Sequence, residues 1–388
     1  MHLVVPHGTT ALFTDPMESS NVGGIKGLQA LLHMSEHLPC HIQIEVSSRV
    51  PTAPDLETTG GKLGLDEVRE ILQWDNCISL GELDPSKVLS KSQEYLAKVV
   101  ATQVLGKIAN GHAAGLSEAS LISYACGGLA DDHECVDFDD AIKRVQLGMG
   151  VLVREGSTER NLEPIVSGLI RSGLDTRHFM FCTDDKHPND ILKEGHIDYM
   201  VNRSIELGLS PIKAIQMATL NAAIHFRVDH LLGSISPGRY ADIILSEALY
   251  PIKPTHVFYK GELVAQNGEL IAQIPRANYP EWFYHTVQVT RGKRAEDFVL
   301  SAPGSKARVR VIEIYPDQII NKAGQAELPV INSNVVSDVN QDVLKIAAVE
   351  RYGKNGNIGI AFVKGFGLNQ GALASSVAHD HHNIVVVG

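Results

Sequence analysis

Short apolar runs that end abruptly in polar residues alternate with longer amphipathic segments through the first half of the chain. The clearest run is 178–183, in which Phe179 to Cys182 is apolar on both faces before Asp184 and Asp185 follow. A short run without polar alternation is typical of a central strand in a parallel sheet, which is buried on both faces. The amphipathic segments between such runs have helical spacing, so the pattern predicts repeated strand–helix units.

Each of five consecutive predicted strands ends in a residue that can carry a charge or bind a metal. These residues follow one another at intervals of 21 or 30 positions, a spacing that suits βα units closing a barrel of about eight strands. The carboxyl ends of the strands form the active-site rim of such a barrel. The five predicted rim residues are Glu82, His112, His133, Arg154 and Asp184.

Helices are predicted between and after these strands, at 65–73, 90–105, 117–126, 136–148, 161–172, 197–207 and 211–226. From about residue 231 the pattern changes to short strands, and a third region begins near Phe298. Its predicted strands are 308–315, 346–349 and 358–363. We therefore expect an α/β fold with a TIM-like (β/α)8 barrel, a small β-sandwich segment and a C-terminal α/β domain. The expected boundaries are 1–230, 231–292 and 293–388.

The amino-acid composition argues against some classes of binding partner, namely nucleic acids and membranes. Hydrophobic residues make up 44% of the chain and charged residues 20%, which is typical of a soluble globular protein. The net charge of −11 argues against non-specific nucleic-acid binding and against a basic surface that faces a membrane. The apolar runs are shorter than a membrane span requires. The 5 cysteines include no CxxC pair, so we expect reduced thiols and a cytoplasmic location.

Glu82, His112, His133 and Asp184 combine two carboxylates with two imidazoles at one predicted rim. This mixture of oxygen and nitrogen ligands suits a divalent transition metal such as Mn, Fe or Zn. Such a metal lowers the pKa of a bound water, and a neighbouring carboxylate can accept the proton. Taken singly, each residue has a simpler interpretation. Asp184 can cap the helix that Pro188 begins, and a lone histidine at a strand end is more often an ordinary polar residue.

The sequence resembles the adenine deaminases of the amidohydrolase superfamily over nearly its whole length. The REGS and CTDD motifs are specific to this branch of the superfamily. The motifs that carry the resemblance are GHAAGL (111–116), DDHE (131–134), REGS (154–157), CTDD (182–185), GHID (195–198), ATLNAA (218–223), SISPGRYADIIL (234–245) and SSVAHD (375–380).

The resemblance implies that adenine is hydrolysed to hypoxanthine and ammonia at a dinuclear manganese or iron centre in a TIM-like barrel. It further implies a cytoplasmic homo-oligomer that acts in purine salvage or catabolism on a small-molecule substrate. By position, Glu82 would bind or bridge the metals and His112 and His133 would be ligands. Asp184 would be both a ligand and the general base. The residues near the purine would be Arg154, Glu155 and Ser157.

Two departures from the family pattern concern the metal ligands. The His-x-His pair of the superfamily's first strand is absent, and the family's DPHE motif reads DPME at 15–18. Met17 therefore replaces a histidine, and a thioether is a poor ligand for Mn or Fe. Asp15 is a further candidate ligand. Near the end of the chain, His379, His381 and His382 are interpreted as a surface turn, with a second metal site as the alternative.

Three functions are compatible with these observations: an adenine deaminase, an amidohydrolase of other specificity, and a non-catalytic or impaired relative. The REGS and CTDD motifs favour the first over the second. The absent His-x-His pair and Met17 favour the third.

We predict that this chain binds at most one metal, weakly, that it tends to aggregate, and that it deaminates adenine little or not at all. A dinuclear centre needs roughly four ligands per metal, more than the predicted set provides. An upstream strand with a His-x-His pair, combined with Met17→His, should restore two metals and turnover. Metal content and ammonia release, measured for both proteins, test this. Two metals and turnover in the unaltered chain would instead point to His187 or His196 as a further ligand.

Overall fold

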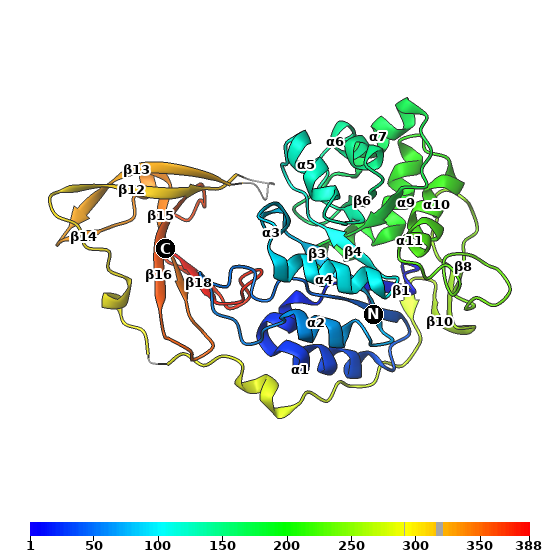
Figure 1. Ribbon diagram of the computed structural model, residues 1–388, viewed down its shortest axis with the longest axis horizontal. Helices are drawn as coiled ribbons and strands as arrows, with labels where there is room; N and C mark the ends of the chain where they lie inside the picture. The colour runs from blue at the N-terminus through cyan, green and yellow to red at the C-terminus, as the bar shows by residue number, and fades with distance from the viewer. Residues whose placement is uncertain (291, 316–320) are drawn as a thin grey trace. The chain divides into compact units, whose positions relative to one another are not determined.

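The computed structural model describes residues 1–290, 292–315 and 321–388, which form two units (Figure 1). The first unit consists of 1–16, 29–49 and 63–278, and the second of 17–28, 50–62 and 279–388. Helix α1 (Met17–Ser35) contributes residues to both units and is kinked at Gly24, which has a φ of 58°.

A curled parallel sheet forms the centre of the first unit. Strands β1 to β4 pair in sequence order, and so do β5 to β7. Ala130 links the two sets, because its N–H donates to Ala109 and its carbonyl accepts from Gly150, both at 2.8 Å. The strands are β1 Ala11–Thr14, β2 His41–Val46, β3 Cys77–Leu83, β4 Ile108–Gly111, β5 Asp131–Asp132, β6 Gly150–Arg154 and β7 Phe179–Cys182.

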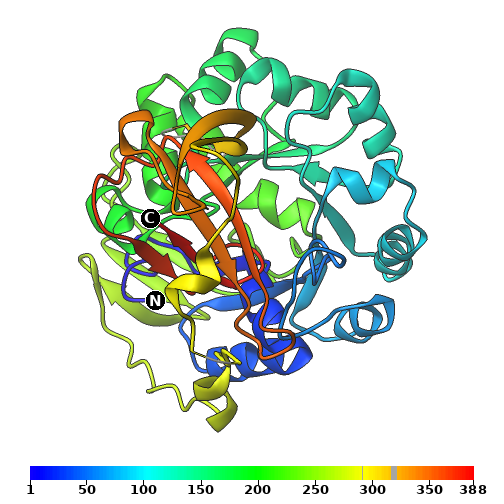
Figure 2. The ribbon, with the colours of Figure 1, turned by 90° about the vertical axis from the view of Figure 1, so that its left-hand side faces the viewer.

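Helices lie outside these strands, as the cyan and green ribbons of Figure 2 show. The alternation of strand and helix is the one that the hydrophobic pattern predicted, and it confirms an α/β fold of the barrel type. The helices are α2 Leu65–Ile71, α3 Pro85–Leu89, α4 Gln93–Val104, α5 Glu118–Ala125, α6 Phe138–Gln146, α7 Leu162–Ser172, α8 Pro188–Glu194, α9 Ile197–Glu206, α10 Pro211–Ala218 and α11 Leu220–His225. Among the residues described, none of the helices is long and apolar enough to cross a membrane.

The single helix predicted at 211–226 is two helices, because the chain breaks at Thr219. The Thr219 hydroxyl donates to the carbonyl of Ile215 at 2.7 Å, and its backbone leaves the helical region at φ −133° and ψ −83°. A threonine that bonds back to the preceding turn weakens the helical pattern there. The spacing of apolar residues continues across the break, which is why the sequence suggested one helix.

One group of buried apolar residues packs helices α7, α9 and α10 against strands β6 and β7. Val151, Val153 and Phe179 from the strands are fully buried, as are Ile165 and Met200 from the helices. The apolar faces of both strands are therefore covered, as the run 178–183 predicted.

A small antiparallel sheet follows the barrel strands within the first unit. Its four strands are β8 Ile243–Leu245, β9 His256–Tyr259, β10 Glu262–Gln266 and β11 Glu269–Leu270. The turn between β9 and β10 contains Gly261, whose φ of 85° is readily available only to glycine. The predicted domain boundaries at 230 and 292 stay predictions, since compactness alone groups 231–278 with the barrel strands.

The C-terminal part of the second unit is a sheet of seven strands among its described residues. This corrects the expected α/β domain: in the described part of 293–388 the helices are short 3-10 turns. The residues 322–331, which include a glycine and a proline, had not been predicted as a strand, yet they pair along the whole of β12. The short connections between consecutive antiparallel strands contain too few residues for the helices that link parallel strands. The strands are β12 Lys306–Glu313, β13 Lys322–Ile331, β14 Asn334–Val335, β15 Val343–Val349, β16 Ile358–Lys364, β17 Leu373–Ser375 and β18 Ile384–Val387.

A buried lysine joins helix α4 to the segments that follow β2 and precede α2. Lys98 is 1% exposed, and its Nζ donates to the carbonyls of Ser48 at 2.9 Å and Leu63 at 2.8 Å. A buried carbonyl without a hydrogen-bond donor raises the free energy of the folded state. Lys98 therefore stabilises both ends of the segment between Ser48 and Leu63.

We predict that Lys98→Met lowers the free energy of unfolding by about 2 kcal/mol, because two buried carbonyls would lose a charged donor. Urea unfolding followed by circular dichroism measures the change. The control is Lys143→Met on helix α6, where the side chain is exposed. Equal unfolding free energies for the two variants would contradict the role given to Lys98.

Candidate metal centre

Three of the predicted rim residues meet at the carboxyl ends of neighbouring strands. Glu82 lies near the end of β3, while His112 and His133 directly follow β4 and β5. Glu82 Oε2 is 3.2 Å from His112 Nδ1 and 3.0 Å from His133 Nε2, and the two ring nitrogens are 3.3 Å apart. One carboxylate oxygen therefore faces both imidazoles.

Asp184 and Glu134 extend this cluster around His133. Potential ligand atoms of His133, Glu134 and Asp184 lie within 4.8 Å of one another, as do those of Glu82, His112 and His133. Sequence reasoning gave Glu134 no role, although it belongs to the DDHE motif. Its Oε1 is 3.3 Å from His133 Nε2, and the residue is 4% exposed. Its position next to His133 was the one signal that could have identified it.

The carboxylates and imidazoles of the cluster shift one another's pKa values. Burial opposes ionisation of Glu82, but hydrogen bonds from His112 and His133 outweigh it and hold the pKa of this carboxyl well below its usual range. Burial likewise opposes protonation of His133, yet its bonds to Glu134 and Glu82 raise the imidazole pKa well above its usual range. His112 shows the same balance, with a raised pKa. Without a metal, the carboxylates and protonated imidazoles therefore compensate one another.

The segment after β2 reaches the neighbouring strand ends with three consecutive side chains. Ser47 donates to Asp15, which follows β1, and Ser48 donates to the backbone carbonyl of Glu82. Arg49 forms an ion pair with the other carboxylate oxygen of Glu82, Oε1. None of these contacts was predicted. The segment leaves Glu82 Oε2 as the oxygen that faces the two imidazoles.

Asp15 lies beside the cluster without joining it. Its carboxylate is so close to Gly81 that a side-chain carbon at that position would lie 2.0 Å from Oδ2. Among the described residues, neither group of potential ligands includes Asp15, and its role as a ligand stays a prediction.

A buried carboxyl, Glu45, lies deeper in the sheet and was also missed. Burial raises the pKa of Glu45 well above its usual range, and the charges of Asp15 and Asp131 add to the effect. Asn110 donates to Glu45, and His225 contacts Asp131 at 2.5 Å. A neutral Glu45 therefore adds no negative charge to the cluster above it.

The three residues expected near a substrate lie in or directly after β6. Arg154 contacts Glu134 at 2.6 Å and Asp184 at 3.2 Å. Glu155 accepts from the N–H of Leu162 at 3.2 Å, and Ser157 donates to Asp190 at 2.6 Å. Burial raises the pKa of Glu155. Their contacts to substrate stay predictions.

The remaining histidines that the sequence singled out have other surroundings. His196 contacts Thr9 Oγ1 at 2.7 Å, and burial lowers its imidazole pKa to about 4. In the second unit, His379 lies 2.8 Å from Asp380, and His382 is only 4% exposed. In the turn at 379–382, the expectation of a surface position holds for the exposed His379 and not for the buried His382. Among the residues described, neither ligand group includes these histidines.

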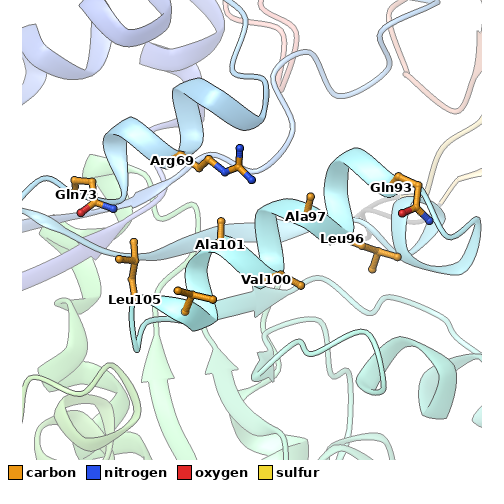
Figure 3. A pocket seen from close by; sticks show the side chains of 9 residues that line it. Arg69, Gln73, Gln93, Leu96, Ala97, Val100, Ala101 and Leu105 are labelled. Atoms are coloured by element: carbon orange, nitrogen blue, oxygen red, sulfur yellow. The ribbon is translucent and has the colours of Figure 1, made fainter.

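An open apolar groove between helices α2 and α4 is separate from the cluster (Figure 3). None of the residues that line it belongs to the cluster. They are Arg69, Gln73, Gln93, Leu96, Ala97, Val100, Ala101, Val104 and Leu105.

The cluster fits a divalent metal by the chemistry of its donors. Two imidazoles and three carboxylates converge, and each has a potential ligand atom within 4.8 Å of others. Mixed nitrogen and oxygen donors suit Mn, Fe or Zn. In the part of the chain that is described, no cysteine belongs to either group. The residues that would hold the metal are Glu82, His112, His133 and Asp184, with Glu134 beside them.

Curated adenine deaminases are similar to this chain along its whole length. An adenine deaminase from Desulforamulus reducens is 56% identical over 386 residues, which cover 100% of this chain and 66% of that protein. Adenine deaminase 3 of Rhizobium meliloti is 42% identical over 389 residues, with 99% and 65% covered. This chain thus spans just under two thirds of the length of these curated relatives. A crystal structure of β-aspartyl dipeptidase from Fervidobacterium islandicum is 18% identical, covers 69% of this chain and 77% of that chain, and has a TM-score of 0.48.

Two family profiles match the sequence itself. The adenine deaminase C-terminal domain matches residues 318–388, and the amidohydrolase family matches residues 2–264. The predicted resemblance is thereby confirmed, and the amidohydrolase match includes every rim residue described above. The chain therefore belongs to the amidohydrolase family.

Proposed function

We propose that this chain has the active site of an adenine deaminase, which hydrolyses adenine to hypoxanthine and ammonia. The observation that carries the proposal is the convergence of Glu82, His112 and His133 on one point beside Asp184. The similarity to adenine deaminases over the whole chain supports adenine as the substrate.

The amidohydrolase family implies a divalent metal, and we propose Mn or Fe, with Zn as the alternative. Glu82, His112, His133 and Asp184 would hold it. Once bound, a divalent metal makes a water molecule easier to deprotonate. The role of the protein's own residues is to hold this arrangement and to move protons.

Asp184 is the proposed general base. It lies at the rim with its side chain 29% exposed, so its carboxylate can meet a water molecule and a substrate. In the overall reaction water adds to C6 of adenine and the C6–N6 bond breaks. The proton that Asp184 accepts from water can then pass to the departing amine, which leaves as ammonia.

The loop after β6, with Glu155 and Ser157, is proposed to lie near the purine. Adenine is a small neutral molecule, so no large charged surface is needed for its recognition. We further propose a homo-oligomer in the cytoplasm that has neither a nucleic-acid nor a membrane partner. The acidic net charge of −11 supports the absence of a nucleic-acid partner.

The test is to load the purified chain with Mn²⁺, Fe²⁺ or Zn²⁺ in turn and to measure hypoxanthine and ammonia released from adenine. Guanine, adenosine and a cyclic amide serve as comparison substrates. Hydrolysis of one of these instead of adenine would indicate an amidohydrolase of other specificity. Metal binding without hydrolysis of any of them would indicate an impaired or non-catalytic family member.

We predict that Asp184→Asn lowers adenine deamination by about two to four decades, because it keeps the side-chain shape and removes the base. Steady-state ammonia release at saturating metal measures the loss. The control is Asp139→Asn on helix α6, whose exposed carboxylate lies outside the ligand groups. A variant at Asp184 with near-full activity would transfer the role to Glu82 or Asp185.

We also predict that the affinity for Mn²⁺ rises with pH, by about tenfold per pH unit for each proton displaced, from below the ordinary histidine pKa of about 6.5 to above it. In the metal-free protein the pKa values of His112 and His133 are raised, so both imidazoles must lose protons before they can bind a metal. The rise should end above these raised pKa values. Equilibrium dialysis across this range measures it, and a pH-independent affinity would contradict the assignment of the two histidines.

A further inference from the structure

We propose that Arg154 is a positioning residue that holds Asp184 and Glu134 in place for the metal, instead of contacting the substrate. This inference deepens the proposed function and rests on it, since Asp184 is the proposed base. It replaces the purine contact that the REGS motif suggested for Arg154.

The contacts of Arg154 engage all three nitrogens of its guanidinium group. Nη1 donates to Glu134 Oε1 at 2.6 Å and to Asp184 Oδ2 at 3.2 Å. Nε and Nη2 both donate to Asn161 Oδ1 at 3.3 Å. The residue is 3% exposed. These bonds use four of the five N–H groups of a buried guanidinium, so its main partners are groups of the protein itself.

The position of Arg154 in the sheet explains which residues it can reach. It ends strand β6, which lies between β5 and β7, and it is paired in register with Cys182. Glu134 follows β5 and Asp184 follows β7. One side chain on the middle strand can therefore connect groups from both neighbours.

The backbone of Asp184 has an uncommon conformation, and its carboxylate has two hydrogen-bond partners. Its φ is 51°, in the left-handed region that few residues other than glycine adopt. Its Oδ1 accepts from the N–H of Asp185 at 2.8 Å, and Oδ2 accepts from Arg154. The two bonds together determine the direction in which the carboxylate points.

Charge gives a second reason for an arginine at this position. Glu134 is buried, and it lies with Asp184 and His133 in a single group of ligand atoms. Two carboxylates this close repel each other, and the guanidinium between them offsets the repulsion. Nη1 bonds both carboxylates while Nε and Nη2 bond Asn161, and a lysine ammonium offers no second and third nitrogen to fix its direction in this way.

The experiment compares Arg154→Met and Arg154→Lys with the unaltered chain. Equilibrium dialysis gives the affinity for Mn²⁺, and steady-state kinetics give kcat and KM for adenine. We expect Arg154→Met to weaken Mn²⁺ binding by about 10- to 100-fold, as the loss of a partner that orients a metal ligand does. It should lower kcat by a similar factor and change KM by less than about threefold. Arg154→Lys should recover part of both losses, and added guanidinium should partly rescue Arg154→Met.

The matched control is Arg203→Met on helix α9. Arg203 has ion pairs with Glu163 at 2.7 Å and Glu206 at 2.9 Å, and neither carboxylate belongs to a ligand group. This variant should retain the metal affinity and kcat of the unaltered chain. An equal loss in Arg203→Met would overturn the proposal, because the effect would then arise from the removal of any paired arginine.

The value of KM also tests whether Arg154 positions the ligands or binds the substrate. A tenfold or greater rise in KM with kcat and metal affinity unchanged would overturn the proposal in favour of substrate binding by Arg154. If Arg154→Met does not fold, Asn161→Ala takes its place, because it removes the acceptor that orients the guanidinium. A loss of Mn²⁺ affinity in Asn161→Ala and Arg154→Lys would support the proposal, and unchanged affinity in both would overturn it.

Failure of the proposed function is distinguishable from failure of this inference. If the unaltered chain binds Mn²⁺ but does not deaminate adenine, the proposed function fails. The Mn²⁺ affinities of the Arg154 variants are measured without adenine, so they still test the role of Arg154.

Discussion

The structure of the rim depends on the need to compensate charges that are gathered in a small, partly buried volume. An isolated buried carboxylate or imidazolium is strongly unfavourable, and each must be paired or must change its protonation state. Burial opposes the charged forms of Glu82, His112 and His133, but their mutual contacts lower the pKa of Glu82 and raise those of the two histidines. For Glu45, burial and two acidic neighbours raise the pKa well above its usual range, which favours its neutral form.

The surrounding fold provides these partners from the ends of parallel strands. Since those ends meet at one edge, residues far apart in sequence become neighbours without long loops. Buried lysine and arginine side chains then form hydrogen bonds to the segments that connect the strands and helices. Lys98 bonds the segment after β2, and Arg144 is 1% exposed and joins helix α6 to Asp132 at 2.8 Å and to the carbonyl of Ala113 at 2.7 Å. The rim is thus supported by polar contacts beneath it as well as by the apolar core.

Charge compensation also gives a role to buried arginines that position the carboxylates of the cluster. Arg49 and Arg154 are both almost fully buried, and each is paired with a carboxylate of the cluster. An arginine at such a position controls the direction of its partner's carboxylate and reduces repulsion between neighbours. The arrangement of ligands consequently depends on cations that would not themselves bind a metal.

The sequence alone determined the alternation of strands and helices and the residues at the strand ends. A short run that is apolar on both faces is typical of a strand in the interior of a sheet, and the intervals between Glu82, His112, His133, Arg154 and Asp184 reflect one strand–helix unit each. Because parallel strands share one active edge, these local signals predicted the cluster of Glu82, His112 and His133, with Asp184 beside His133.

The tertiary structure decided what the local pattern does not encode. Glu134 and Arg49 look like ordinary charged residues in sequence, and their roles appear only once neighbouring strands bring them to Glu82, His133 and Arg154. The strand at 322–331 forms because β12 offers backbone partners along its length, despite a glycine and a proline of low strand propensity. His382 is buried by surrounding residues that its own segment does not reveal. In each case the deciding energy comes from contacts between residues distant in sequence, whereas hydrophobic periodicity reports only local burial.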